Sequence, residues 1–164
     1  MARTQGGNAV RTGNVLEAVV TGTFTAHGFQ CVAFNAWQKA PENFSRELLL
    51  HNVPYTTIYG GRGFTEFQVA SERHNLLARI ECKWQQTTGS VDEKLPYTYL
   101  SCVEAIPEPF VIILIDGDGF RPGAIQWLRD AARKRLYIPP EKPDKRIAVM
   151  NTTEFLTWCN QLFR

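Results

Sequence analysis

The chain of 164 residues is 44% hydrophobic and 21% charged, with a formal net charge of +2. This length suits one domain with a sizeable core, which needs neither a metal nor a disulfide to fold. No apolar run is long enough to span a bilayer and the polar N-terminus is unlike a signal peptide, so we expect a cytoplasmic protein that binds no membrane. The four cysteines form no CxxC pair, which argues against a zinc site.

The first third of the chain predicts a helix, a strand and an irregular region. Residues 1–13 are expected to form a flexible arm. Asn14 is a suitable cap for a helix with apolar residues four apart, and Gly28 marks its end. The stretch "FQCVAFNAW" then predicts a strand, whereas residues 38–63 are expected to be irregular, with one short helix over 45–50.

The rest of the chain alternates strands with helices. The stretches "FTEFQVA" and "LLARIECKWQ" flank a short turn and predict an antiparallel hairpin. A helix is expected after Gly89, followed by the apolar strand "PFVIILID", a helix from Pro122, the strand "RIAVM" and a last helix capped by Asn151. Residues 14–164 thus predict a single α/β domain with a central mixed β-sheet flanked by helices.

One strand face of the hairpin carries an acid, a base and an amide. In "RIECKWQ" the apolar residues fall on one face, and Glu81, Lys83 and Gln85 fall on the other. Glu66 lies in the middle of the partner strand, and same-face residues of a hairpin come within about 5 Å. Two such carboxylates repel each other, and a dication removes that conflict. The cluster therefore predicts a Mg²⁺ site at Glu66 and Glu81, with Lys83 orienting or helping to deprotonate an attacking water, as metal-assisted phosphodiester hydrolysis requires.

The same pattern has a simpler explanation. A sheet with one face in water places polar residues at every second position of a strand. Convergence of Glu66, Glu81 and Lys83 in a concave site would distinguish a functional cluster from such a wet face.

An acid on one strand followed by Glu81-Cys82-Lys83 on the next resembles the PD-(D/E)xK nuclease superfamily. The run "RIECKWQQTTGSVDEKLPY" looks like a small bacterial and phage group within it. The resemblance implies a restriction-endonuclease-like αβββαβ core, nuclease activity and Mg²⁺, for which Mn²⁺ would substitute. Glu66 stands where the family usually has Asp, and the longer carboxylate keeps the chemistry.

Two further residues are candidates for the catalytic site. Several nucleases of this superfamily carry an acid on the first helix, and Glu17 is the match here for a metal ligand. Its alternative role is a surface carboxylate favoured by the helix dipole. Gln85 continues the polar strand face and is expected to support the substrate or the water.

DNA is the expected partner. Residues 129–146 hold seven Lys or Arg against three acids, which suits a phosphate backbone as well as it suits a solvated surface. The candidates for DNA binding are Arg133, Arg135, Lys39, Arg62 and Lys94.

The sequence therefore predicts a Mg²⁺-dependent DNA endonuclease. One alternative is a Holliday-junction-resolving or recombination nuclease, which would act as a homodimer because it makes paired cuts. Another is a non-catalytic DNA-binding protein of the same fold. An idle cluster of buried charge would cost stability, which argues against the non-catalytic alternative.

Overall fold

The computed structural model describes the backbone of residues 5–164 and the side chains from residue 15 onward. Helix α1 (Gln5–Ala26) begins well before Asn14, so most of the segment expected to be a flexible arm is helical. Residues 1–4 of that arm lie outside the described residues. The helix ends where the sequence predicted, because Gly28 adopts a φ of 85°, which a side chain disfavours.

A mixed six-stranded sheet forms the centre of the molecule and confirms the predicted fold class. Strand β2 is antiparallel to β3 and β3 is antiparallel to β4, whereas the outer neighbours pair in parallel. The strands lie in chain order across the sheet: β1 (Gln30–Ala33), β2 (Glu47–Thr56), β3 (Arg62–Ser71), β4 (Leu76–Trp84), β5 (Phe110–Asp116) and β6 (Arg146–Met150).

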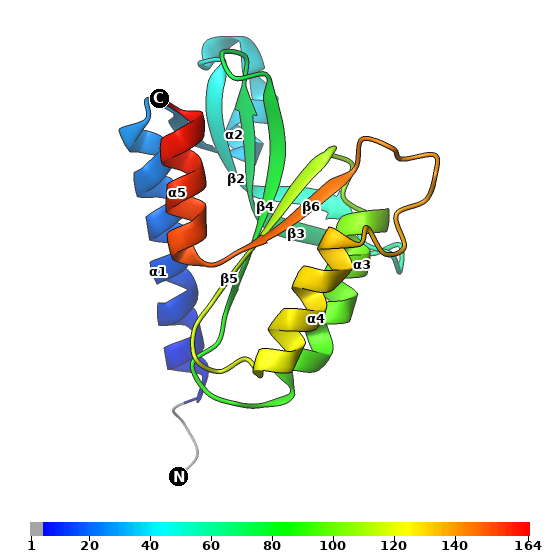
Figure 1. The fold of residues 1–164 in the computed structure, drawn as a ribbon. Helices are drawn as coiled ribbons and strands as arrows, with labels where there is room; N and C mark the ends of the chain where they lie inside the picture. The colour runs from blue at the N-terminus through cyan, green and yellow to red at the C-terminus, as the bar shows by residue number, and fades with distance from the viewer. Residues whose placement is uncertain (1–4) are drawn as a thin grey trace.

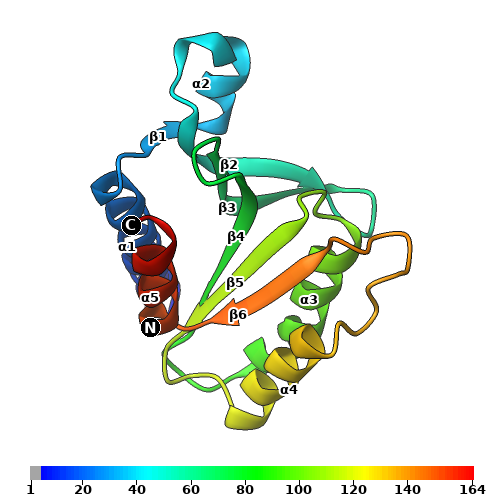
Figure 2. The ribbon, with the colours of Figure 1, turned by 45° about the horizontal axis from the view of Figure 1, so that its top comes forward.

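Helices cover both faces of this sheet (Figures 1 and 2). Helix α1 lies beside α5 (Thr152–Leu162) on one face, and a core of Phe24, Ile80 and Phe155 packs beneath them. On the other face α3 (Lys94–Glu104) lies beside α4 (Pro122–Arg133) over a second core. None of the helices within residues 5–164 has the length and apolar character needed to cross a bilayer.

Two further predictions in the first third of the chain are wrong. The strand predicted over "FQCVAFNAW" ends at Ala33, and the next residues form the short helix α2 (Phe34–Lys39), which packs Phe34 and Trp37 onto β1 and β2. Most of the helix predicted over residues 45–50 is strand β2, which begins at Glu47. Its leucines are buried on both faces of a strand that is paired on both edges, so they show no alternation.

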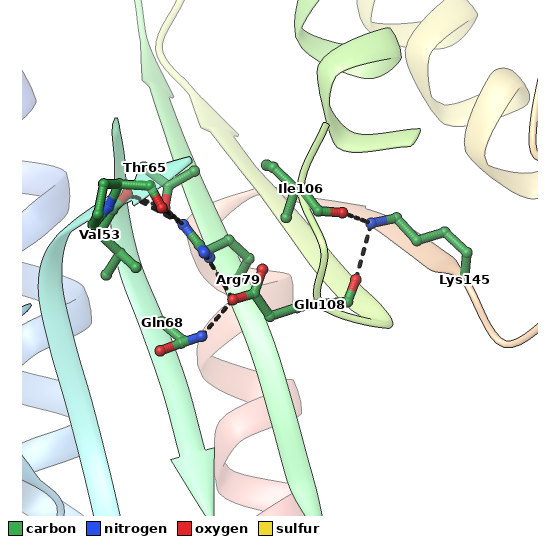
Figure 3. Close-up of polar contacts among 8 residues, drawn as sticks. Val53, Thr65, Gln68, Arg79, Ile106, Glu108 and Lys145 are labelled. Atoms are coloured by element: carbon green, nitrogen blue, oxygen red, sulfur yellow. Dashed lines mark hydrogen bonds and ion pairs between the residues drawn. The ribbon is translucent and has the colours of Figure 1, made fainter. Parts of the chain in front are cut away.

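A buried ion pair ties the middle strands together. Arg79 on β4 donates from Nη2 to Glu108 Oε1 at 2.7 Å, and the two side chains are only 3% and 5% exposed. Arg79 Nη1 donates to the carbonyl of Val53 on β2 at 3.2 Å and to Thr65 Oγ1 on β3 at 2.9 Å (Figure 3). One guanidinium therefore joins three strands to the segment that precedes β5.

The same segment is held from the other side by a buried lysine. Lys145 Nζ donates to the carbonyls of Ile106 and Glu108, the latter at 2.9 Å (Figure 3). Burial lowers the pKa of Lys145 to about 8. Gln68 Nε2 also donates to Glu108 Oε1, so Arg79, Gln68 and Lys145 all contact Glu108, whereas its Oε2 is buried without a hydrogen-bond partner.

We expect Glu108→Gln to lower the free energy of unfolding by about 3–5 kcal/mol in urea titrations, because it leaves the buried Arg79 without its counter-charge. The matched control is Glu72→Gln, which removes the charge from the Arg46–Glu72 pair, whose side chains are 80% and 68% exposed. That control should stay within about 0.5 kcal/mol of wild type. Equal losses in the two variants would contradict a structural role for the buried pair.

Candidate active site

Glu81 and Lys83 point into the layer between the sheet and α3. Strand β4 pairs in parallel with β5, which places Glu81 beside Ile113 and Lys83 beside Ile115, and both isoleucines belong to the core under α3 and α4. The two side chains line a cavity of about 360 Å³ together with Lys94 at the start of α3. This part of the polar strand face is therefore covered, and an open wet face does not explain it.

Glu66 lies where strands β3 and β4 separate. Their antiparallel ladder runs from the Ser71–Leu76 pair to the Phe67–Ile80 pair, and Glu66 is the next residue along β3. There its Oε2 accepts a hydrogen bond from the backbone N–H of Cys82 at 2.8 Å. The Glu66 carboxylate thus takes the place of the β3 carbonyl that would accept this hydrogen bond if the ladder continued. We call this point, where β3 and β4 separate, the fork, and the hydrogen bond holds Glu66 there next to Glu81.

A break in the alternation of β3 accompanies this fork. Thr65 and Gln68 both contact the Arg79–Glu108 pair, although strict alternation would place residues three apart on opposite faces of the strand. Asn52, which lies across from Glu66 on β2, has a φ of 55°. Such a left-handed backbone at a residue other than glycine is uncommon, and this local twist changes which face the side chains of the two strands occupy.

The three charged groups perturb one another. Burial, together with the negative charge of Glu81, raises the pKa of Glu66 to about 7. For Lys83, burial lowers the pKa, but the carboxylates of Glu81 and Glu66 outweigh it and the net shift is upward. Lys83 Nζ donates to Glu81 Oε1. Lys83 is therefore an ammonium ion. The repulsion between the two close carboxylates is seen in the raised pKa of Glu66.

These residues fit a divalent cation. Glu81 Oε2 is buried without a hydrogen-bond partner, and a cation would satisfy it while it relieves the repulsion from Glu66. Mg²⁺ is commonly held by one or two carboxylates, with water and substrate phosphate as its other ligands. Among the residues whose side chains are described, no three His, Cys, Asp or Glu groups gather closely enough to form a metal site by themselves. A two-carboxylate site completed by substrate is the arrangement that this geometry allows.

Glu17 lies on the α1 side of the fork. It lines a cavity of about 280 Å³ that also includes Glu66, His51 and Asn52. Glu17 and Glu66 therefore share one cavity, whereas Glu81 and Lys83 line another. His51 was missed in the sequence because it lies on β2, where no strand was expected and no alternation marks it.

Gln85 is engaged in a loop. Its side-chain Nε2 donates to the carbonyl of Thr87 at 2.6 Å, and its backbone carbonyl accepts from Gly119 N at 2.9 Å. At Gly117, which has a φ of 104°, a Cβ would lie 2.2 Å from the Gln85 carbonyl oxygen, so only glycine fits there. The loop "DGDGFRPG" thus packs against the end of β4, and the Gln85 side chain hydrogen-bonds there instead of to Glu81 or Lys83.

The predicted DNA-binding residues divide into near and distant groups. Lys94 lines the cavity of Glu81 and Lys83, and Arg62 borders an adjoining cavity of about 470 Å³. Lys39 ends helix α2, beside the far edge of the sheet formed by β1.

The distant group is the basic stretch around α4 and β6. Arg135 donates to the carbonyl of Lys145, next to Arg146, which pairs with Phe110 at the start of β5. Lys83 pairs with Ile115, near the other end of β5. Arg133 lies beside Arg135 at the end of α4 and forms an ion pair with Asp130. The structure therefore does not bring Arg133 and Arg135 together with Glu81 and Lys83.

The fold agrees with a comparison against protein families. A family model described as a PD-(D/E)XK nuclease superfamily domain matches residues 8–163, so the chain belongs to this superfamily. Its αβββαβ core corresponds to α1, β2, β3, β4, α3 and β5. No curated protein and no solved structure gives a match.

We expect the metal-free protein to lose stability as pH rises from about 4.5 to about 7, because the Glu66 pKa is raised in the folded state and protonation at low pH favours folding. Glu66→Gln should remove about 2–3 kcal/mol of this pH dependence. Urea titrations in EDTA across that interval measure it. A variant whose stability falls as steeply as that of wild type would show that Glu66 is not the perturbed group.

Proposed function

We propose that the protein is a Mg²⁺-dependent endonuclease that hydrolyses phosphodiester bonds of DNA in the cytoplasm. Its main support is the convergence of Glu66, Glu81 and Lys83 at the fork of β3 and β4, in a chain of a nuclease superfamily. The carboxylates of Glu66 and Glu81 repel each other, and one Glu81 oxygen is buried without a partner. Both features favour binding of a cation, and a cluster with a purely structural role would not be expected to have them.

In this proposal Glu66 and Glu81 hold the cation, and Glu17 lies on the α1 side of Glu66 without binding the cation directly. Bound Mg²⁺ would polarise the scissile phosphate and lower the pKa of the attacking water, and Mn²⁺ would substitute for it. The Lys83 ammonium would orient the water and balance negative charge that develops on the phosphate. Gln85 would support the loop that borders the substrate.

Substrate binding would use the cations closest to the site. Lys94 and Arg62 would contact the phosphates next to the scissile bond, and Lys39, Arg133 and Arg135 would contact more distant phosphates. Cuts in both strands of a duplex require two active sites, so we propose that the enzyme acts on duplexes as a homodimer.

We expect Lys83→Ala to lower the cleavage rate at least about 100-fold, because it removes the only cation that contacts Glu81 in the described part of the chain. The assay uses supercoiled plasmid, linear duplex, single strand and a four-way junction, each with Mg²⁺ or with EDTA. The control is Lys134→Ala, which removes an exposed lysine beyond α4.

Metal-dependent cutting that is lost in Lys83→Ala and kept in Lys134→Ala would support the enzyme. The preferred substrate would separate an endonuclease for duplexes from a junction-resolving one. Cutting at the wild-type rate by Lys83→Ala would overturn the assigned role, and binding without cutting of any substrate would favour a non-catalytic DNA-binding protein.

Mg²⁺ should raise the melting temperature of the wild type by several degrees, because a ligand that binds only the native state stabilises it by about 2.7 kcal/mol at 100 times its Kd. Glu81→Ala should show a much smaller rise, whereas Glu104→Ala, at an exposed carboxylate that ends α3, should respond as the wild type does. Thermal scans with and without Mg²⁺ measure the shift. Equal rises in Glu81→Ala and wild type would place the cation elsewhere.

A further inference from the structure

A stacked pair of tyrosines, one of them exposed, lies beside the candidate active site. Tyr59, in the turn between β2 and β3, is 81% exposed. Its ring stacks on that of Tyr97 in helix α3, with 5.5 Å between the centroids and 23° between the planes. The outer face of Tyr59 is therefore open to solvent, while its inner face rests on a ring fixed by a helix.

The tyrosine pair adjoins the reacting groups. Tyr97 lines the same cavity as Glu81 and Lys83, and so does Tyr55 on β2. Tyr55 also borders the neighbouring cavity at the β2–β3 turn. The exposed ring of Tyr59 thus stacks on a ring that lines the cavity of Glu81 and Lys83.

Cations accompany these rings. The guanidinium of Arg62 lies 5.0 Å from the ring centroid of Phe64, which is itself half exposed at the start of β3. Lys94 is exposed at the start of α3, three residues before Tyr97. Exposed aromatic rings interleaved with Arg and Lys form the kind of surface that binds the bases and the phosphates of a single strand at once.

Folding removes little of the Tyr59 ring from water, so this ring contributes little hydrophobic stabilisation to the fold. Its exposed, stacked position suits contact with a ligand better than a role in the core. Bases within a duplex already stack on both neighbours, and only an unpaired base can offer its face to a side chain. We propose that the Tyr59–Tyr97 pair is a stacking platform for an unpaired base, so that the enzyme acts on DNA with single-stranded character next to the scissile bond. This inference rests on the proposed nuclease function.

Binding measured without cleavage tests the platform. In a Lys83→Ala background with EDTA, Tyr59→Ala should weaken binding of a labelled single-stranded oligonucleotide at least about fivefold, since stacking on one ring contributes about 1–3 kcal/mol per base. Tyr59→Phe, which keeps the ring, should bind as the parent does. Fluorescence of 2-aminopurine in the strand should be quenched by the parent and by Tyr59→Phe, but much less by Tyr59→Ala.

Two controls make the result specific. Tyr137→Ala removes another exposed tyrosine, in the segment between α4 and β6, and should leave binding unchanged. The same oligonucleotide annealed into a blunt duplex should bind Tyr59→Ala and its parent equally. Unchanged single-strand affinity in Tyr59→Ala, an equal loss for single strand and duplex, or no binding of nucleic acid by any variant would overturn the platform.

Different results would contradict the stacking platform and the nuclease function. Metal-dependent cleavage that requires Lys83 but is indifferent to Tyr59 on every substrate would overturn the platform and leave the nuclease intact. Ring-dependent binding of single strands by a protein that cuts no substrate would leave the platform intact and contradict the nuclease.

Discussion

The guanidinium of Arg79 is the constraint on which the rest of the structure depends. It contacts β2, β3 and the carboxylate of Glu108 before β5, and it does so almost without contact to water. A buried charge is costly unless its partners are well placed, so few registers of these strands are compatible with it. Arg79 lies two residues before Glu81 on the same strand face. The hydrogen bonds of Arg79 that fix the strands therefore also fix the positions at which Glu81 and Lys83 enter the cavity.

Beyond that fixed point the sheet opens, and the opening creates the site. The β3–β4 ladder ends at Phe67, Asn52 adopts a left-handed backbone, and the Glu66 carboxylate accepts the hydrogen bond from Cys82 N–H. Burial, together with the resulting proximity of Glu66 to Glu81, raises the Glu66 pKa and lowers the free energy of unfolding at neutral pH. The cation proposed above would relieve this repulsion, because a ligand that binds only the native state stabilises the fold.

The sequence predicted what depends on local periodicity and missed what depends on distant partners. Alternation was enough to identify the hairpin and to place Glu81 and Lys83 on one face. It gave β2 the wrong structure, because leucines buried on both faces do not alternate, and it left His51 unnoticed there. Arg79 resembled a residue of a wet strand face, since its partner Glu108 is 29 positions away. The basic stretch showed positive charge, but its Arg135 is used on backbone carbonyls at the other end of the sheet.

The most direct test of the site is the coupling of metal binding to proton release. Mn²⁺ is titrated into the wild type in a calorimeter, at pH about 7 and about 9, in buffers of different ionisation enthalpy. The dependence of the binding heat on the buffer gives the number of protons released on binding. We expect roughly half a proton from Glu66 near pH 7 and almost none near pH 9, because the Glu66 pKa is about 7. Glu66→Gln should bind Mn²⁺ more weakly and lose this release. Equal affinity and equal proton release in the two proteins would contradict a cation site at the fork of β3 and β4.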